Sequence, residues 1–214
     1  MRARGRLSAI VLLAVALAVG LMLPASAHTT KTSPKGTASL AALLAKDGSG
    51  FDRNWNDYDI TDNAVATVLK VKPGSPVAVL ADGTRPVTAF LPTDRAFRKL
   101  AEDLTGKRYK REPAVFGDLA STLGVDTIES VLLYHVVPGA TLTYRQARHA
   151  NGATLTTALP GGTLTVRVSC HHRVSLKDAD PDATNAKVVA PNLNKGNLQI
   201  AHGISRVLRP VDLP

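Results

Sequence analysis

One tripeptide has the residue types of a metal site. Cys170-His171-His172 offers a thiol and two imidazoles, and zinc binds both kinds of ligand. On a strand, however, only Cys170 and His172 would point the same way, so the stretch supplies two ligands where a closed zinc site needs four. We therefore expect a turn with an exposed or half-buried thiol, and we predict no metal site here.

A second stretch resembles a calcium-binding loop. Asp178, Asp180 and Asp182 alternate along the chain, as ligands do in such loops. The required glycine is missing, Pro181 interrupts the pattern, and Val189 stands where the final carboxylate belongs. We therefore predict an Asx-rich surface turn. No other pattern indicates a metal or a cofactor.

Three aromatic residues lie among acid and amide side chains between residues 51 and 59. Phe51, Trp55 and Tyr58 are spaced i, i+4 and i+7, and aromatic faces beside Asp and Asn suit the stacking of sugar rings. The alternative, which we favour, is that the rings form a cap packed on the core. If the protein binds a carbohydrate, Trp55 and Tyr58 are the expected contacts.

Tyr134 and His135 form a further candidate site. Helical spacing places His135 on the same face as Ile128 and Leu132, so we expect a buried imidazole that has hydrogen-bond partners. Tyr134 falls about 100° away on a helix and is the better candidate for a surface contact. His202, which lies on a predicted strand, is expected to be a core histidine as well.

Enzyme motifs are absent from the sequence. There is no Gly-x-Ser-x-Gly, no phosphate-binding glycine loop, no His-Glu-x-x-His and no Cys-x-x-Cys. The sequence therefore predicts a protein that is not an enzyme.

The first 27 residues have the layout of a secretory signal peptide. Three arginines within the first six residues precede an apolar run over residues 7–23, and small residues follow up to Ala27. We expect cleavage after Ala27 and no membrane segment beyond it. Residues 28–37 then form a flexible leader, and residues 38–214 form a single domain with an enlarged segment at about 51–82.

The charge and the cysteine content limit the classes of partner and the disulfide bonds that we expect. The net charge is +9, or +6 once Arg2, Arg4 and Arg6 are removed, and Cys170 is the only cysteine. No intramolecular disulfide can form, so packing alone must hold the fold together. An exported basic protein meets proteins and acidic polysaccharides, and we expect no nucleic-acid partner. The basic run at residues 107–111 is expected to be a solvated loop.

The apolar pattern changes from helical to alternating along the chain. Helical spacing covers residues 39–46, 61–72, 94–105, 113–123 and 126–135, with a strand at 86–91. Alternation follows at residues 153–159, 163–169, 187–190 and 198–208. Helices that come first and strands that follow without intervening helices indicate an α+β fold with largely antiparallel sheets.

Three stretches, in order, resemble the fasciclin domain family. Residues 87–97 (VTAFLPTDRAF) are similar to its first motif, residues 132–139 (LLYHVVPG) to its central Tyr-His segment, and residues 200–210 (IAHGISRVLRP) to its closing motif. The sequence departs at Ser205, where the family usually carries Asp, at Gly203, where it carries a branched apolar residue, and at Leu91, where it carries a small one.

The resemblance implies a wedge of two β-sheets with helices clustered on one side. It also implies a secreted, bacterial fasciclin-like protein that is extracellular or loosely associated with the cell surface. Its function would be adhesion or protein binding, in which the Tyr134-His135 segment takes part in some relatives. The expected partner is an extracellular protein or a cell-surface polysaccharide. The alternative function is carbohydrate or cell-wall polymer binding through residues 51–58.

Overall fold

The computed structural model describes residues 35–48 and 50–211. The predicted signal peptide and most of the predicted leader lie outside the described residues. No helix within the described residues is long and apolar enough to cross a membrane.

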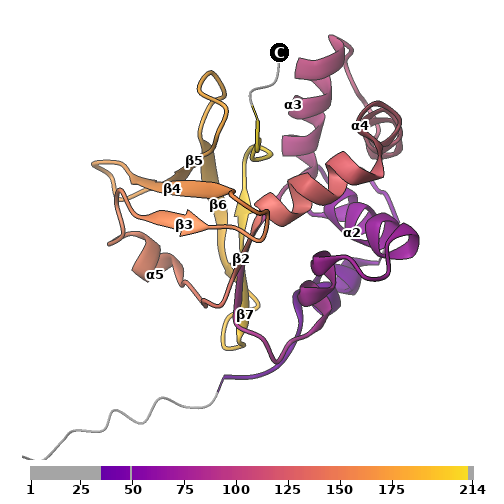
Figure 1. Ribbon diagram of the computed structural model, residues 1–214. Coiled ribbons are helices and arrows are strands. Elements are labelled where there is room, and N and C mark those ends of the chain that lie inside the picture. Colours follow the sequence, from indigo (N-terminus) through magenta and orange to yellow (C-terminus); the bar gives the residue numbers. More distant parts are fainter. Residues whose placement is uncertain (1–34, 49, 212–214) are drawn as a thin grey trace, which may run out of the picture. The chain divides into compact units, whose positions relative to one another are not determined.

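The helices pack together on one side of the fold, except the short helix at Tyr144–Ala147, which lies beside the strands (Figure 1). Their bounds are α1 Leu40–Leu44, the short 3-10 helix η1 Ala45–Asp47, α2 Asp59–Val71, the 3-10 helix η2 Pro76–Ala81, α3 Asp94–Thr105, α4 Glu112–Tyr134 and α5 Tyr144–Ala147. Local signals account for several of their ends. Ser39 accepts the N–H of Ala42 at the start of α1, and Gly106 ends α3 in the left-handed conformation (φ 68°) that glycine adopts without a steric penalty.

Helix α2 begins two residues before the predicted Thr61, and its first turn is capped from another helix. The carboxylate of Asp94 accepts the N–H groups of Asp59 (3.2 Å) and Ile60 (2.9 Å). Thr61 instead donates its hydroxyl to the carbonyl oxygen of Pro92 (3.0 Å). Thr61 therefore does not cap α2, and Asp94 satisfies the start of that helix because α2 and α3 begin beside each other.

Helix α4 contains a break at Gly124, whose backbone is not helical (φ 72°, ψ 165°). The sequence correctly separates two helical stretches at this glycine. The carboxylates of Asp126 and Glu129, near the start of the second stretch, both bind Lys72, which follows α2, at 2.5 Å. These ion pairs tie the second half of α4 to the end of α2.

Seven strands are joined in the order β2-β1-β7-β6-β5-β4-β3. Their bounds are β1 Val87–Pro92, β2 Val136–Pro138, β3 Thr154–Thr156, β4 Thr163–Val168, β5 Val174–Lys177, β6 Ala186–Leu193 and β7 Gln199–Ile204. All neighbours are antiparallel except β1 and β7, which run parallel. Strand β6 pairs with β5 near its start and with β7 along the rest, with two register shifts, so it belongs to both halves of the sheet.

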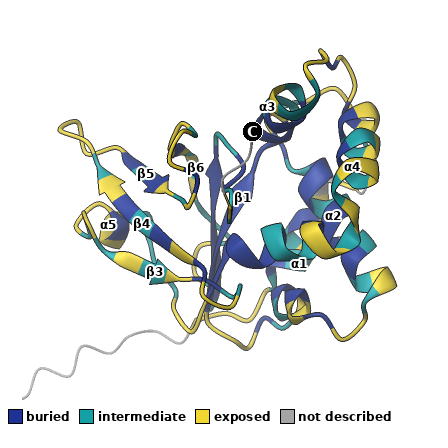
Figure 2. Cartoon of the chain, turned by 45° about the horizontal axis from the view of Figure 1, so that its top comes forward, coloured by how far each residue is buried: buried dark blue, intermediate teal, exposed yellow. Residues whose placement is uncertain are grey.

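Burial concentrates where the helices meet β1 and β7, whose residues are all buried (Figure 2). Helix α2 contributes Ile60, Ala64, Val65 and Val68 to this interior. The segment predicted as an enlargement therefore carries part of the core. The predicted α+β class, with largely antiparallel strands and helices on one side, is confirmed.

Candidate binding site

His135 is buried at the end of α4, as predicted. Its Nε2 accepts the N–H of Leu208 (2.9 Å), which means that this nitrogen carries no proton. Its Nδ1 lies 2.7 Å from the carbonyl oxygen of Val131, to which it donates. Burial lowers the pKa of His135 to about 4. The imidazole is therefore a neutral structural link between α4 and the C-terminal segment.

Tyr134 is also buried, and the prediction of a surface position for it is wrong. The side chain is 1% exposed, packs among the sheet residues and donates its hydroxyl to the carbonyl oxygen of Thr163 (2.7 Å). Burial raises its pKa to about 12. The end of α4 has the other helices on one side and the β3–β4 hairpin on the other. The hairpin covers Tyr134 through Gly162 and Thr163, so both members of the Tyr-His pair face the interior.

His202 is a core histidine, as predicted. Its Nε2 donates to the carbonyl oxygen of Leu142 (2.8 Å), and its ring stacks on Phe90 with centroids 5.9 Å apart. Burial lowers its pKa. The side chain supports the packing of β7 and offers no free surface.

The aromatic residues of the 51–58 segment are half-buried and packed, in agreement with the favoured cap. Phe51 contacts the ring of Phe116 at 5.7 Å between centroids, and the guanidinium of Arg98 lies 4.5 Å above the ring of Trp55. Tyr58 packs into the core beside β7. Burial, followed by the charges of nearby carboxylates, raises the pKa of Tyr58 to about 12.

The two metal-like stretches form turns. Cys170 is exposed and free, in the turn that joins β4 and β5. Asp180 accepts the N–H groups of Asp182 and Ala183, which makes the predicted Asx turn. Asp180 itself is buried rather than exposed, because its carboxylate also pairs with Arg209 at 3.1 Å.

A basic face on α3 is the clearest charged feature outside these turns. Arg95, Arg98 and Lys99 lie on α3, and Arg206 follows β7 beside them. Burial, and then the charges of these arginines, lower the pKa of Lys99. Within residues 35–48 and 50–211, no carboxylate lies within 4 Å of the charged groups of the three α3 cations. We refer to Arg95, Arg98, Lys99 and Arg206 as the α3 basic face.

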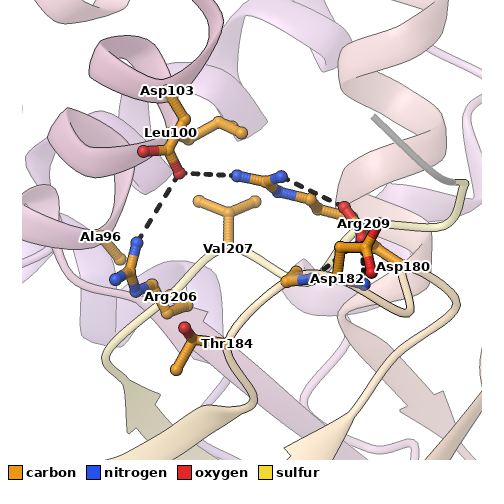
Figure 3. Close-up of a pocket in the computed structure, with 10 residues that line it drawn as sticks. Ala96, Leu100, Asp103, Asp180, Asp182, Thr184, Arg206, Val207 and Arg209 are labelled. Carbon is orange, nitrogen blue, oxygen red and sulfur yellow. Dashed lines mark hydrogen bonds and ion pairs between the residues drawn. The ribbon is translucent and has the colours of Figure 1, made fainter. Parts of the chain in front are cut away.

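Two hollows flank this face. One has a volume of about 310 Å³ and is lined by Asn56, Thr93, Arg95, Lys99, Val189, Ala190 and Ser205. The other, of about 330 Å³, is shown in Figure 3 and is lined by residues of α3, the Asp180 turn and the closing motif. Ser205 lines the first and its neighbour Arg206 the second, so the hollows adjoin through the backbone at 205–206.

The second hollow contains an ion-pair network centred on Asp103 (Figure 3). Asp103 pairs with Arg209 at 2.8 Å, and Arg209 reaches Asp180 on its other side at 3.1 Å. Arg206 approaches Asp103 only to 3.7 Å, and 32% of its side chain is exposed against 12% for Arg209. Arg209 is thus occupied by structural contacts, whereas Arg206 remains available to a partner.

The sequence contained a signal for this face that motif reasoning missed. Arg95, Arg98 and Lys99 are spaced i, i+3 and i+4, which places them together on a helix. Ser205 contributes to the basic character of this face because it carries no negative charge. Its hydroxyl accepts the N–H of Lys187 (3.1 Å). At this position an Asp would place a carboxylate in the hollow that Arg95 and Lys99 line.

The comparisons with known proteins agree with this fold. The family model of the fasciclin domain matches residues 71–210. The structure is similar to that of a FAS1 domain pair from the insect cell adhesion molecule Fasciclin I, with a TM-score of 0.53 and 16% sequence identity. The match covers 81% of this chain and 51% of that one, so the chain spans about half the length of the solved pair. No curated protein matches the sequence.

The family match extends over more than half of the chain, and the protein belongs to the fasciclin domain family. Fasciclin domains are generally adhesion or protein-binding modules that bind other proteins or matrix at the cell surface.

Proposed function

We propose that the protein is a secreted, non-catalytic adhesion module that binds an acidic surface of an extracellular protein through the α3 basic face. The observation that carries this proposal is that Arg95, Arg98 and Lys99 share one face, where no carboxylate of the described residues forms an ion pair with them. Like charges held together are unfavourable unless an anionic group approaches them. An acidic partner would supply that group.

The charge of the whole chain supports the same partner. The net charge of +6 that remains after removal of Arg2, Arg4 and Arg6 attracts acidic surfaces at a distance, and complementary charges raise the rate and the specificity of association. Arginine at such a face can hold a carboxylate through two parallel hydrogen bonds. The proposed site therefore recognises carboxylate groups on the partner.

Carbohydrate or wall-polymer binding through residues 51–58 has less support. Arg98 covers one face of Trp55, and Phe51 contacts Phe116. A sugar ring stacks on an open aromatic face, and these contacts already occupy one face of Trp55 and part of Phe51. The segment is better explained as part of the packing around α3.

Binding of the purified protein to cells of its own source tests the proposal. The double variant Arg95→Glu/Lys99→Glu should lose at least tenfold in affinity, because each reversed charge would then repel the acidic partner. Lys110→Glu makes the same kind of change at an exposed lysine in the other basic run and should bind normally. Melting curves confirm that the variants are folded.

The nature of the partner and the secretion of the chain are tested with the same material. Protease treatment of the cells should abolish binding, whereas binding that survives protease and is lost after removal of wall polysaccharide would favour the alternative. Mass spectrometry of culture medium should find a chain that starts at His28. Full-length protein retained in membranes would contradict secretion.

A further inference from the structure

A buried cluster of acidic side chains lies at the N-terminal end of α3. Asp57, Asp94 and Glu112 come from three separate segments, yet one carboxylate oxygen of each lies within 4.8 Å of the others. Asp57 is 8% exposed, and Asp94 and Glu112 are both 0% exposed. Three carboxyl groups are thus removed from water at one point.

Among the described residues, two of the three carboxyl groups have no partner at ordinary hydrogen-bond distance and angle. Asp94 uses its oxygens to accept the N–H groups of Asp59 and Ile60. Both carboxyl oxygens of Asp57 and both of Glu112 are buried without a partner, and neither residue forms an ion pair within the described part of the chain. Buried polar atoms are rarely left in this state, and an unpaired buried carboxylate is costly.

Helix ends compensate only part of the negative charge. Asp59, Asp94 and Glu112 are the first residues of α2, α3 and α4, and each helix start carries roughly half a positive charge. Three starts therefore offset about one and a half charges, whereas the three cluster carboxylates carry three when ionised.

We propose that Asp57, Asp94 and Glu112 form a calcium-binding site. The donors are all oxygens, which selects a hard cation over zinc or copper. A divalent cation would satisfy the unpartnered oxygens of Asp57 and Glu112 and balance the remaining charge. The carboxylate of the exposed Asp52 lies within 4.8 Å of those of Asp57 and Asp59, so acidic groups extend from the buried cluster to the surface.

Calcium suits this cluster better than magnesium. Magnesium requires near-octahedral geometry and usually keeps several of its waters, whereas calcium accepts six to eight oxygens in flexible arrangements. Side chains that are 0–8% exposed leave little room for a hydrated ion. Bound calcium would hold the starts of three helices and the 51–58 segment together.

The test is a calorimetric titration of the purified protein with calcium chloride after EDTA treatment, together with melting curves. We expect saturable one-site binding and a rise of several degrees in melting temperature at millimolar calcium, since a ligand that binds only the folded state stabilises it. Magnesium chloride should bind at least tenfold more weakly. No binding and no melting shift up to about 10 mM calcium, above the weak end of extracellular sites, would overturn the proposal.

Amide substitutions localise the site. Glu112→Gln and Asp57→Asn should each lower calcium affinity at least tenfold, and Glu112→Gln should melt at or above the parent protein in EDTA because it removes a buried charge. The matched control, Asp126→Asn, changes a carboxylate whose side chain is 88% exposed and should bind calcium normally. Undiminished binding by Glu112→Gln would contradict the assignment. If a variant fails to fold, the titration of the parent protein still decides.

Discussion

The hydroxyl of Tyr58 occupies the space that a β-carbon on Gly203 would need. The β-carbon of Ala190 approaches the same point at 2.9 Å. Gly203 is not one of the described glycines that have a positive φ. The requirement for glycine at this position is therefore steric. The departure from the family at Gly203 is thus explained by the segment before α2, which places Tyr58 against β7.

This contact predicts a coupled pair of substitutions. Gly203→Ala should destabilise the fold by about 1–3 kcal/mol through overpacking. Tyr58→Phe removes the blocking hydroxyl, so Gly203→Ala should cost less in that background, although Ala190 still limits the rescue. The measurement is a double-mutant cycle of denaturant unfolding. Additive effects within about 0.5 kcal/mol would show that Tyr58 is not the obstacle.

A second prediction separates structure from binding at the Tyr-His pair. His135→Ala leaves Val131 and Leu208 without their partner and should lower the free energy of unfolding by about 1–3 kcal/mol. Tyr134→Phe loses one hydrogen bond, at about 1 kcal/mol. Cell binding should fall only in proportion to the unfolded fraction, with the exposed His171→Ala as control. A His135→Ala protein of unchanged melting temperature that no longer binds would refute this structural role.

The pH dependence of His135 has a definite sign. Its folded pKa of about 4 lies below the ordinary value of 6.5, so the unfolded chain binds the extra proton first as the pH falls. The contribution of His135 to the free energy of unfolding should therefore decrease by roughly 3 kcal/mol between pH 6.5 and pH 4. His135→Gln should reduce this slope. An unchanged slope in the variant would assign the acid sensitivity to other groups.

Because the chain has one cysteine, we predict that reductant does not change the stability of the fold. Cys170 is exposed and free, so oxidation can cap it or join two chains but cannot close a loop within one. Reduction should convert any covalent dimer to monomer and leave the melting temperature essentially unchanged. A loss of several degrees would mean that an intermolecular disulfide stabilises the fold, and Cys170→Ser provides the comparison.

Much of the local structure follows from the sequence alone. The helical spacing of α3, its end at Gly106 and the break at Gly124 are encoded by neighbouring residues, because apolar period and glycine conformation act over a few positions. The burial of His135 follows in the same way from Ile128 and Leu132. The family motifs in residues 87–210 then led to the correct fold class.

Tertiary structure decided what covers each face and which distant side chains meet. Tyr134 lies about 100° around the helix from His135. It is nevertheless buried, because the β3–β4 hairpin packs on its side of the helix. Asp94 starts α3 but caps α2. Glu112 joins Asp57 across more than fifty residues. Sequence periodicity defines a face within one element, whereas the partner of that face depends on how the elements pack, and no local pattern encodes that contact.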